Sequence, residues 1–223
     1  MEIDHKTHLI LASGSPRRAK ILHSLGVDFE IVKSDAPEVA YSGDPERTVS
    51  ENAVAKGAAA RASLVSRLAS CDVRHSTCDT PVDSTPLPSP TPLPSSSPSP
   101  SPTPTLLPIL SADTIVWLDG RIYGKPRDLD EAREFLRGLS GRTHSVFTGV
   151  ALDGDVKVVR SDVKFRVLSE SDVDEYVMSV RPLDRAGAYD IDERGDLIVE
   201  SYTGSYENIM GLPVEPLKEW GIV

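Results

Sequence analysis

A run of proline, serine and threonine interrupts the middle of this chain, and the rest of the sequence has to fold around it. Residues 79–108 read DTPVDSTPLPSPTPLPSSSPSPSPTPTLLP and hold most of the 18 prolines of the chain, with almost no charge. Such a segment cannot pack a core and favours polyproline II or disorder. We therefore expect one domain over residues 1–223 with an insertion at about 72–108, which serves as a spacer or as a ligand for a proline-binding groove.

The composition of the whole chain limits its partners. Of its 223 residues, 39% are hydrophobic and 26% charged, and the formal net charge is -10. This acidic balance, without a basic stripe, argues against a nucleic-acid polymer or an anionic membrane as partner. The sequence has no signal-peptide core and no apolar run of membrane-spanning length, so we expect a cytoplasmic protein. Cys71 and Cys78 are interpreted as free thiols, because four suitable metal ligands are not in sight.

Outside the proline-rich segment, strand-like and helix-like patterns alternate. Strands are predicted at 8–13 and 28–35, in a hairpin over 108–126 that turns at Asp119–Gly120, and in a second hairpin over 143–168 that turns at Gly154–Asp155. Helices are predicted over 16–25, 44–69, 128–141, 169–180 and about 215–220. The helix over 128–141 begins with a capping box of Asp128 and Glu131.

Two adjacent arginines stand at the start of the first predicted helix. Ser15 is suited to the N-cap and Pro16 to the first helical position, so Arg17 and Arg18 occupy the first turn. The helix dipole disfavours cations there, whereas the free N–H groups of that turn attract anions. This predicts a phosphate or carboxylate between the two arginines, and a solvated surface pair is the alternative.

Two further cations could face the same anion. Lys56 follows the apolar stripe of Val49 and Ala53 along its helix, so it points inward, either to reach a cleft or to extend to the rim of the core. The turn at Asp119–Gly120 brings Asp113 and Lys125 into neighbouring positions on opposite faces of the hairpin. They can converge only if a bulge or an early strand end occurs near Gly124.

Seven short motifs follow one another in an order that resembles a known family. They are SGSPRR (13–18), AVAKGA (53–58), ADTIV (112–116), YGKP (123–126), SGRTHSVFTGVAL (140–152), AGAY (186–189) and GSYENIMGLP (204–213). Together they resemble the Maf family of nucleoside triphosphate pyrophosphatases over the whole chain except the insertion. ADTIV and HSVFTGVAL are more similar to its dTTP/UTP branch than to its 7-methyl-GTP branch. The resemblance implies an α/β fold of two lobes, a mixed β-sheet flanked by helices with a central cleft, and a homodimer.

The resemblance also implies a reaction, the hydrolysis of a nucleoside triphosphate to the monophosphate and pyrophosphate with Mg²⁺ or Mn²⁺. Phosphoryl transfer depends mainly on positioning and charge neutralisation. Five residues would bind the substrate phosphates: Ser13, Arg17, Arg18, Lys56 and Lys125. Asp113 matches the general base and would hold the metal together with Glu38, for which nearby carboxylates could substitute. A strand-end aspartate that bonds its own backbone is the alternative for Asp113.

Base specificity is where the sequence departs from the family pattern. Arg17 and Thr114 match specificity positions of the dTTP/UTP branch, but Asp192 and Glu193 stand where its AYGIQG pattern has glutamine and glycine. Glutamine both donates and accepts, as the edge of uracil or thymine requires, whereas an ionised aspartate only accepts. We expect dTTP and UTP as first substrates. The alternatives are a purine-directed (7-methyl-GTP-like) pyrophosphatase and a non-catalytic nucleotide-binding regulator of cell division.

Overall fold

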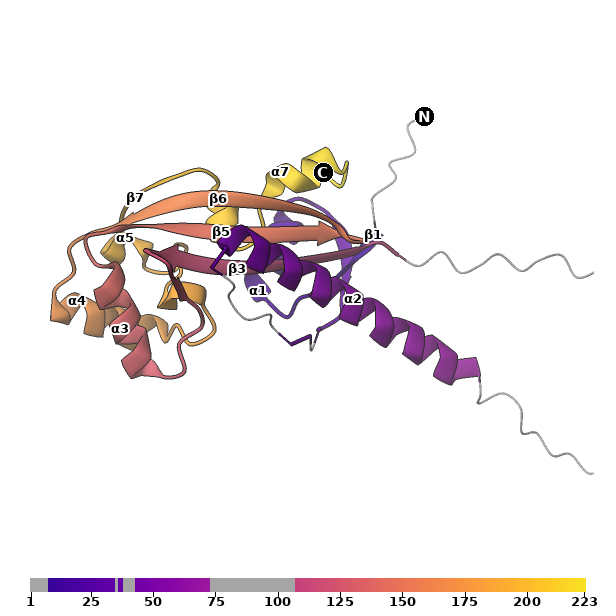
Figure 1. Cartoon of the computed structure of the whole chain (residues 1–223), viewed down its shortest axis with the longest axis horizontal. Coiled ribbons are helices and arrows are strands. Elements are labelled where there is room, and N and C mark those ends of the chain that lie inside the picture. The colour runs from indigo at the N-terminus through magenta and orange to yellow at the C-terminus, as the bar shows by residue number, and fades with distance from the viewer. Residues whose placement is uncertain (1–7, 35, 38–42, 73–106) are drawn as a thin grey trace, which may run out of the picture.

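A mixed seven-stranded sheet forms the centre of the molecule (Figure 1). The computed structural model describes residues 8–34, 36–37, 43–72 and 107–223. Its strands are β1 (His8–Leu11), β2 (Asp28–Ile31), β3 (Ile109–Leu118), β4 (Arg121–Tyr123), β5 (Thr143–Leu152), β6 (Asp155–Phe165) and β7 (Val199–Thr203). They follow the order β2-β1-β3-β5-β6-β7, and β4 pairs with β3. Because β1 pairs in parallel with both β2 and β3, segments from before and after the insertion share one sheet.

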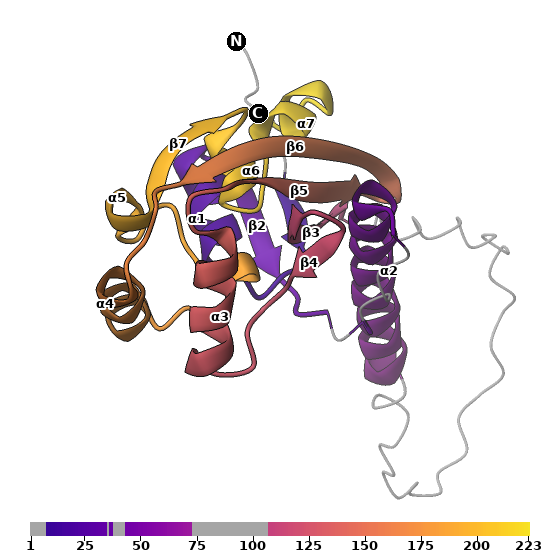
Figure 2. The ribbon, with the colours of Figure 1, turned by 60° about the vertical axis from the view of Figure 1, so that its left-hand side comes forward.

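The helices confirm the α/β prediction. They are α1 (Pro16–Ser24), α2 (Pro45–Asp72), α3 (Leu129–Leu139), α4 (Glu170–Val180), α5 (Gly195–Ile198), α6 (Tyr206–Ile209) and α7 (Val214–Glu219), with a 3₁₀ turn, η2, at Ala186–Ala188. In Figure 2, α2 stands apart from the neighbouring helices α3 and α4, with β3 and β4 between them. A search of the described residues finds no helix that is both long and apolar enough to cross a membrane.

Two larger hydrophobic clusters stabilise the two ends of this arrangement. One joins α3 and α4 to the sheet through fully buried side chains such as Leu136, Phe165 and Tyr176. The other packs α1 and α7 against β1 through Leu22, Leu217 and neighbouring residues. Elements from both clusters, α1 and η2 among them, contribute residues to the cavity described below.

Helix α2 lies unusually close to the sheet at one point. The Cβ of an alanine at Gly149 would lie 2.5 Å from the carbonyl oxygen of Val49, so only glycine fits beneath the helix there. One turn further, Ser111 Oγ donates a hydrogen bond of 2.7 Å to the carbonyl oxygen of Ala53. Val49 and Ala53 are fully buried, as the predicted stripe requires. The helix is therefore fixed above Asp113, which pairs with Gly149 in the sheet.

Both predicted hairpins form, but one of their turns is displaced. The β3–β4 turn is Asp119–Gly120 as predicted, with positive φ at both residues. The predicted turn at Gly154–Asp155 is wrong by one residue, because Leu152 pairs with Asp155 and the turn is formed by residues 153 and 154. Both turn residues again have positive φ, as the favoured two-residue turn requires.

Two helix starts differ from the prediction in their hydrogen bonds. Ser15 precedes α1 as expected, but its side chain makes no capping bond, and its own N–H donates to Ser13 Oγ at 3.2 Å. Asp128 caps α3 by accepting from the N–H of Glu131. The reciprocal half of the predicted capping box is wrong, because the Glu131 carboxylate accepts from the N–H of Arg127 at 2.6 Å. Both α1 and α3 nevertheless begin where predicted.

Candidate active site

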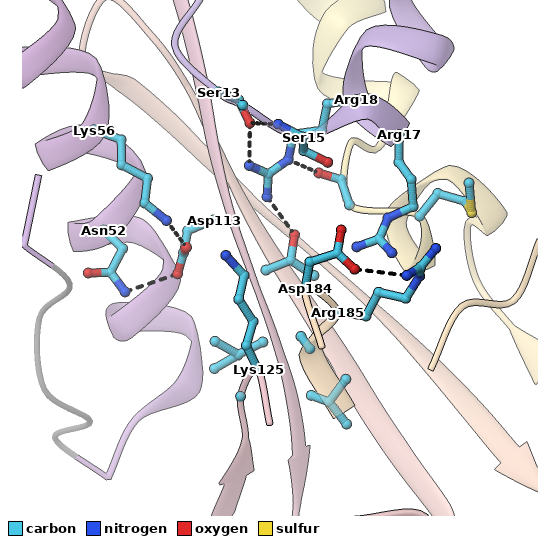
Figure 3. A pocket seen from close by; sticks show the side chains of 18 of the residues that line it. Ser13, Ser15, Arg17, Arg18, Asn52, Lys56, Asp113, Lys125, Asp184 and Arg185 are labelled. Atoms are coloured by element: carbon cyan, nitrogen blue, oxygen red, sulfur yellow. Dashed lines mark hydrogen bonds and ion pairs between the residues drawn. The ribbon is translucent and has the colours of Figure 1, made fainter. Parts of the chain in front are cut away.

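A cavity of about 830 Å³ opens between the loop before α1, helix α2, strand β3 and the segment around η2. Its size is typical of a small-molecule site. It is lined by all five predicted phosphate-binding residues and by two more predicted site residues: Ser13, Arg17, Arg18, Lys56, Lys125, Asp113 and Thr114. Side chains that lie far apart in the sequence thus meet in one place (Figure 3).

Asp113 lies at the wall of the cavity beneath α2 and is 5% exposed. Lys56 Nζ lies 2.5 Å from its Oδ1, and Asn52 Nδ2 donates to its Oδ2 at 2.9 Å. Lys56 therefore reaches the cleft, which was one of the two interpretations of its inward position. Both carboxylate oxygens of Asp113 accept hydrogen bonds from side chains of α2. These contacts do not support the alternative, in which the carboxylate bonds its own backbone.

Lys125 reaches the same wall because β4 is short. The ladder pairs Val116 with Tyr123, and β4 ends there. The early strand end near Gly124, which convergence with Asp113 requires, is therefore present. Figure 3 shows the Lys125 side chain directed toward the Asp113 carboxylate from the side opposite α2.

Arg18 is held against the cavity wall by three neutral oxygens. Its Nε donates to the carbonyl oxygen of Gly211 at 2.8 Å, its Nη1 to Ser13 Oγ at 3.0 Å and its Nη2 to Thr114 Oγ1 at 3.1 Å. Thr114 Oγ1 lies in turn 3.1 Å from Thr148 Oγ1 on β5. The planar guanidinium is thereby fixed by the loop, the sheet and the segment after α6.

Arg17 faces a carboxylate. Its Nη1 lies 3.0 Å from Asp190 Oδ2, which also accepts from Arg185 Nε at 2.9 Å. Burial alone would raise the pKa of Asp190, but the bonds from Arg185, the N–H of Asp192 and Arg17 lower it, so the carboxylate stays ionised. One anion beside the arginine pair is thus the carboxylate of Asp190. Because Arg17 and Arg18 both bond other groups of the protein, the alternative of a solvated surface pair is not supported.

Among the residues of the cavity wall that were not anticipated from the sequence, Asn52, Arg185 and Asp190 contact predicted site residues. Asn52 stands one helical turn before Lys56, so the spacing of four residues was a usable signal. Asp190 stands at the first glycine of the AYGIQG pattern, where a charged residue was also a signal.

One predicted site residue lies outside the lining of the cavity. Asp192 does not line the cavity, because its carboxylate lies 2.5 Å from Lys20 Nζ and accepts from the Tyr206 hydroxyl at 3.1 Å. Its predicted contact with a base therefore has no geometric support. Glu38, the predicted second metal ligand, lies outside the described residues, as do Cys78 and nearly all of the insertion. The described residues contain no cluster of three or more His, Cys, Asp or Glu side chains that could hold a metal ion.

Known proteins match nearly the whole length of this chain. A family model described as "Maf-like protein" matches residues 8–220. A dTTP/UTP pyrophosphatase of Chromobacterium violaceum is 37% identical over 212 residues, which cover 93% of this chain and 90% of the relative. A dTTP/UTP pyrophosphatase of Dictyoglomus thermophilum is 36% identical over 215 residues, with 94% and 92% covered. One of Bacillus cereus (strain B4264) is 36% identical over 215 residues, with 94% and 91% covered.

Proposed function

Because the chain belongs to the Maf family, we propose that it is a nucleoside triphosphate pyrophosphatase whose first substrates are dTTP and UTP. The observation that carries this proposal is the buried Asp113, which lies beside Lys56 and faces Lys125 in a cavity lined by arginines. A protein that only binds a nucleotide does not need a carboxylate among its phosphate-binding cations. The arrangement therefore favours an enzyme over a non-catalytic regulator.

The phosphate-binding role of the cavity follows from its charge. Arg18 on α1, Lys56 on α2 and Lys125 after β4 line the same cavity as Asp113, and Ser13 adds a hydroxyl beside Arg18. A triphosphate carries several negative charges that these cations would neutralise. Arg17 lies farther from Asp113 along the wall, where it shares the carboxylate of Asp190 with Arg185. We infer that Arg18 and the two lysines contribute more to phosphate binding than Arg17 does.

In the proposed reaction a water molecule attacks the α-phosphorus. Asp113 accepts the proton that the water loses, the new P–O bond forms, and the bond from the α-phosphorus to the oxygen bridging to the β-phosphate breaks. Pyrophosphate leaves and the nucleoside monophosphate remains. Lys56, whose Nζ lies 2.5 Å from Asp113 Oδ1, lines the same cavity and would neutralise charge on the phosphates.

The residues fit a divalent cation that the substrate itself helps to hold. Mg²⁺ commonly uses one or two carboxylates and takes its other ligands from phosphates and water. Asp113 offers a hard oxygen in the cavity, and Glu38 stays the predicted second ligand. When bound, the cation would neutralise phosphate charge. Its presence, a homodimer and a cytoplasmic location stay predictions made from the sequence.

The pyrimidine preference gains support from the position of Asp192. The repulsion expected between this carboxylate and a carbonyl of the base requires the side chain to line the cavity, and Lys20 and Tyr206 hold it elsewhere. The departure from the AYGIQG pattern is therefore a weaker argument for a purine substrate than the sequence alone indicates.

The test is product analysis with Mg²⁺ over dTTP, UTP, CTP, GTP and 7-methyl-GTP. We expect pyrophosphate and the monophosphate, without orthophosphate, and the highest kcat/KM for dTTP and UTP. Asp113→Asn should lower kcat by about 10²- to 10⁴-fold and leave dTTP affinity within a few-fold, because the base acts in the transition state. The matched control is Asp130→Asn on the exposed face of α3. Orthophosphate as product, or normal turnover in Asp113→Asn, would contradict the proposal.

A further inference from the structure

We propose that Asn52 is a positioning residue that fixes the carboxylate of Asp113 in the orientation needed for proton transfer. The inference rests on the proposed function, because it assumes that Asp113 is the base. No motif used to recognise the family contains Asn52. What points to it is its direct contact with Asp113 in the wall of the cavity.

The two side chains form a buried pair. Asn52 is 4% exposed and Asp113 is 5% exposed, and Asn52 Nδ2 donates to Oδ2 at 2.9 Å. Lys56 binds the other carboxylate oxygen, Oδ1. Asn52 and Lys56 are four residues apart, so they extend from adjacent turns on one face of α2 (Figure 3). A rotation of the carboxylate would therefore break two hydrogen bonds at once.

The position of the donor is built into the packing of α2. Val49, just before Asn52, rests with its carbonyl oxygen above Gly149, where no Cβ fits. Ala53, just after Asn52, accepts a hydrogen bond from Ser111 through its carbonyl oxygen. The helix backbone is thus held to β5 and β3 on either side of Asn52. The amide group cannot drift away from Asp113 without loss of these contacts.

The chemistry of an amide suits this role. The N–H group of asparagine donates to a carboxylate but neither titrates nor takes up the proton that a base abstracts. Lys56, by contrast, brings a full charge and can also contact a phosphate. Asn52 therefore orients the Asp113 carboxylate without adding a charge, whereas Lys56 adds a positive charge. A base that is misplaced by about 1 Å can cost about 10²-fold in rate, whereas substrate binding depends on the surrounding cations.

The central test is Asn52→Leu, which removes the donor and keeps much of the side-chain volume. We expect kcat for dTTP to fall by about 10- to 100-fold, with KM and the melting temperature nearly unchanged. The matched control is Ser50→Ala on the same helix, because Ser50 does not line the cavity and its hydroxyl donates to the carbonyl oxygen of Glu46 within α2. Its kcat should stay within about twofold. Asn52→Ser, which retains a short donor, should recover part of the lost kcat.

A double variant separates positioning from a general packing effect. In the Asp113→Asn background, Asn52→Leu should cause little further loss, because there is no base left to position. An equal loss in both backgrounds, a similar loss in Ser50→Ala, or an unchanged kcat in Asn52→Leu would overturn the inference. If the wild-type protein releases no pyrophosphate, the proposed function fails and the inference fails with it. If the wild-type protein does release pyrophosphate but a variant gives one of these contradicting results, the role of Asn52 is overturned and the proposed function stands.

Discussion

Two carboxylates that stand two positions apart have different surroundings in this protein. Asp190 is buried in the cavity wall and shares its Oδ2 between Arg17 and Arg185. Asp192 lies outside the lining, where Lys20 and Tyr206 hold its carboxylate. The backbone between them turns so that the N–H of Asp192 donates to Asp190 Oδ1 at 2.9 Å. Of these two aspartates, Asp190 lines the cavity, whereas Asp192, which stands at the glutamine position of the family pattern, does not.

This difference predicts opposite outcomes for two conservative variants. Asp190→Asn removes the charge that holds Arg17, so we expect the ratio of kcat/KM for dTTP and GTP to change by about tenfold, as for the loss of one charged hydrogen bond. Asp192→Gln should leave this ratio within about twofold. Steady-state kinetics with both nucleotides, alongside melting temperatures, checks both. A larger change in Asp192→Gln would return base recognition to the position that the sequence pattern marks.

The sequence motifs predicted which residue types gather, and the fold decides which of them touch. Ser13, Arg18, Lys56 and Lys125 were all placed in the cavity by motifs with a recognisable phosphate chemistry. The pairing of Arg17 with Asp190 spans 173 residues of sequence, and that of Asn52 with Asp113 spans 61. No local pattern predicts such pairings, because they depend on how helices and strands pack.

At the scale of elements, the contact of α2 with β5 determines how Asp113, the proposed base, meets the side chains of the helix. The helix approaches the strand at Gly149, directly beside the Asp113 position of β3. Any outward movement of α2 would move Asn52 and Lys56 together, because both belong to this helix. Stability and activity are therefore coupled at this crossing.

Gly149→Ala should disrupt this contact. Its Cβ would lie 2.5 Å from the carbonyl oxygen of Val49 and 2.7 Å from the carbonyl carbon, so the helix or the strand has to shift. We expect a loss of about 1–3 kcal/mol in the free energy of unfolding, measured by urea denaturation, together with a lower kcat. Gly124→Ala is the control for stability, because its Cβ would meet no heavy atom within 4 Å. Equal stabilities for the two variants would show that the crossing is not tight.

Elements themselves were predictable because their signals are local. Periodicity, N-caps and glycines at helix ends located the main helices, and Asp119–Gly120 located a turn. The second hairpin was misplaced by one residue because Asp153, Gly154 and Asp155 all favour turns, so that only strand register decides between them. Register depends on long-range pairing, which the local sequence does not contain.

At the scale of the whole molecule, one buried histidine links stability to pH. His144 lies on β5, is 1% exposed, packs edge-on against Phe165 and bonds Tyr189 through Nε2 at 2.9 Å. Burial lowers the pKa of His144 from 6.5 to about 3, and the charge of Asp162 opposes this only in part. The folded protein therefore keeps His144 neutral, whereas the unfolded chain binds a proton there below about pH 6.5.

The sign of the effect follows. Since the folded pKa is the lower one, the contribution of His144 is present above pH 6.5 and is lost as the pH falls toward 3, at up to about 1.4 kcal/mol per pH unit. Urea denaturation of His144→Gln and the wild type should show their difference in stability shrinking by about 2 kcal/mol between pH 7 and pH 5. Parallel curves for His144→Gln would contradict the prediction.

The insertion divides the folded chain into two pieces. Residues 73–106 join two pieces that meet through the parallel pairing of β1 with β3 and through the packing of α2 on the sheet. The proposed phosphate ligands Ser13, Arg18 and Lys56 belong to the first piece, whereas Asp113 and Lys125 belong to the second. In the terms of molecular assembly, the two pieces resemble the subunits of a heterodimer joined by a covalent tether, and the cavity lies where they meet. The tether sets the effective concentration at which the piece before the insertion and the piece after it, each with part of the proposed site, associate.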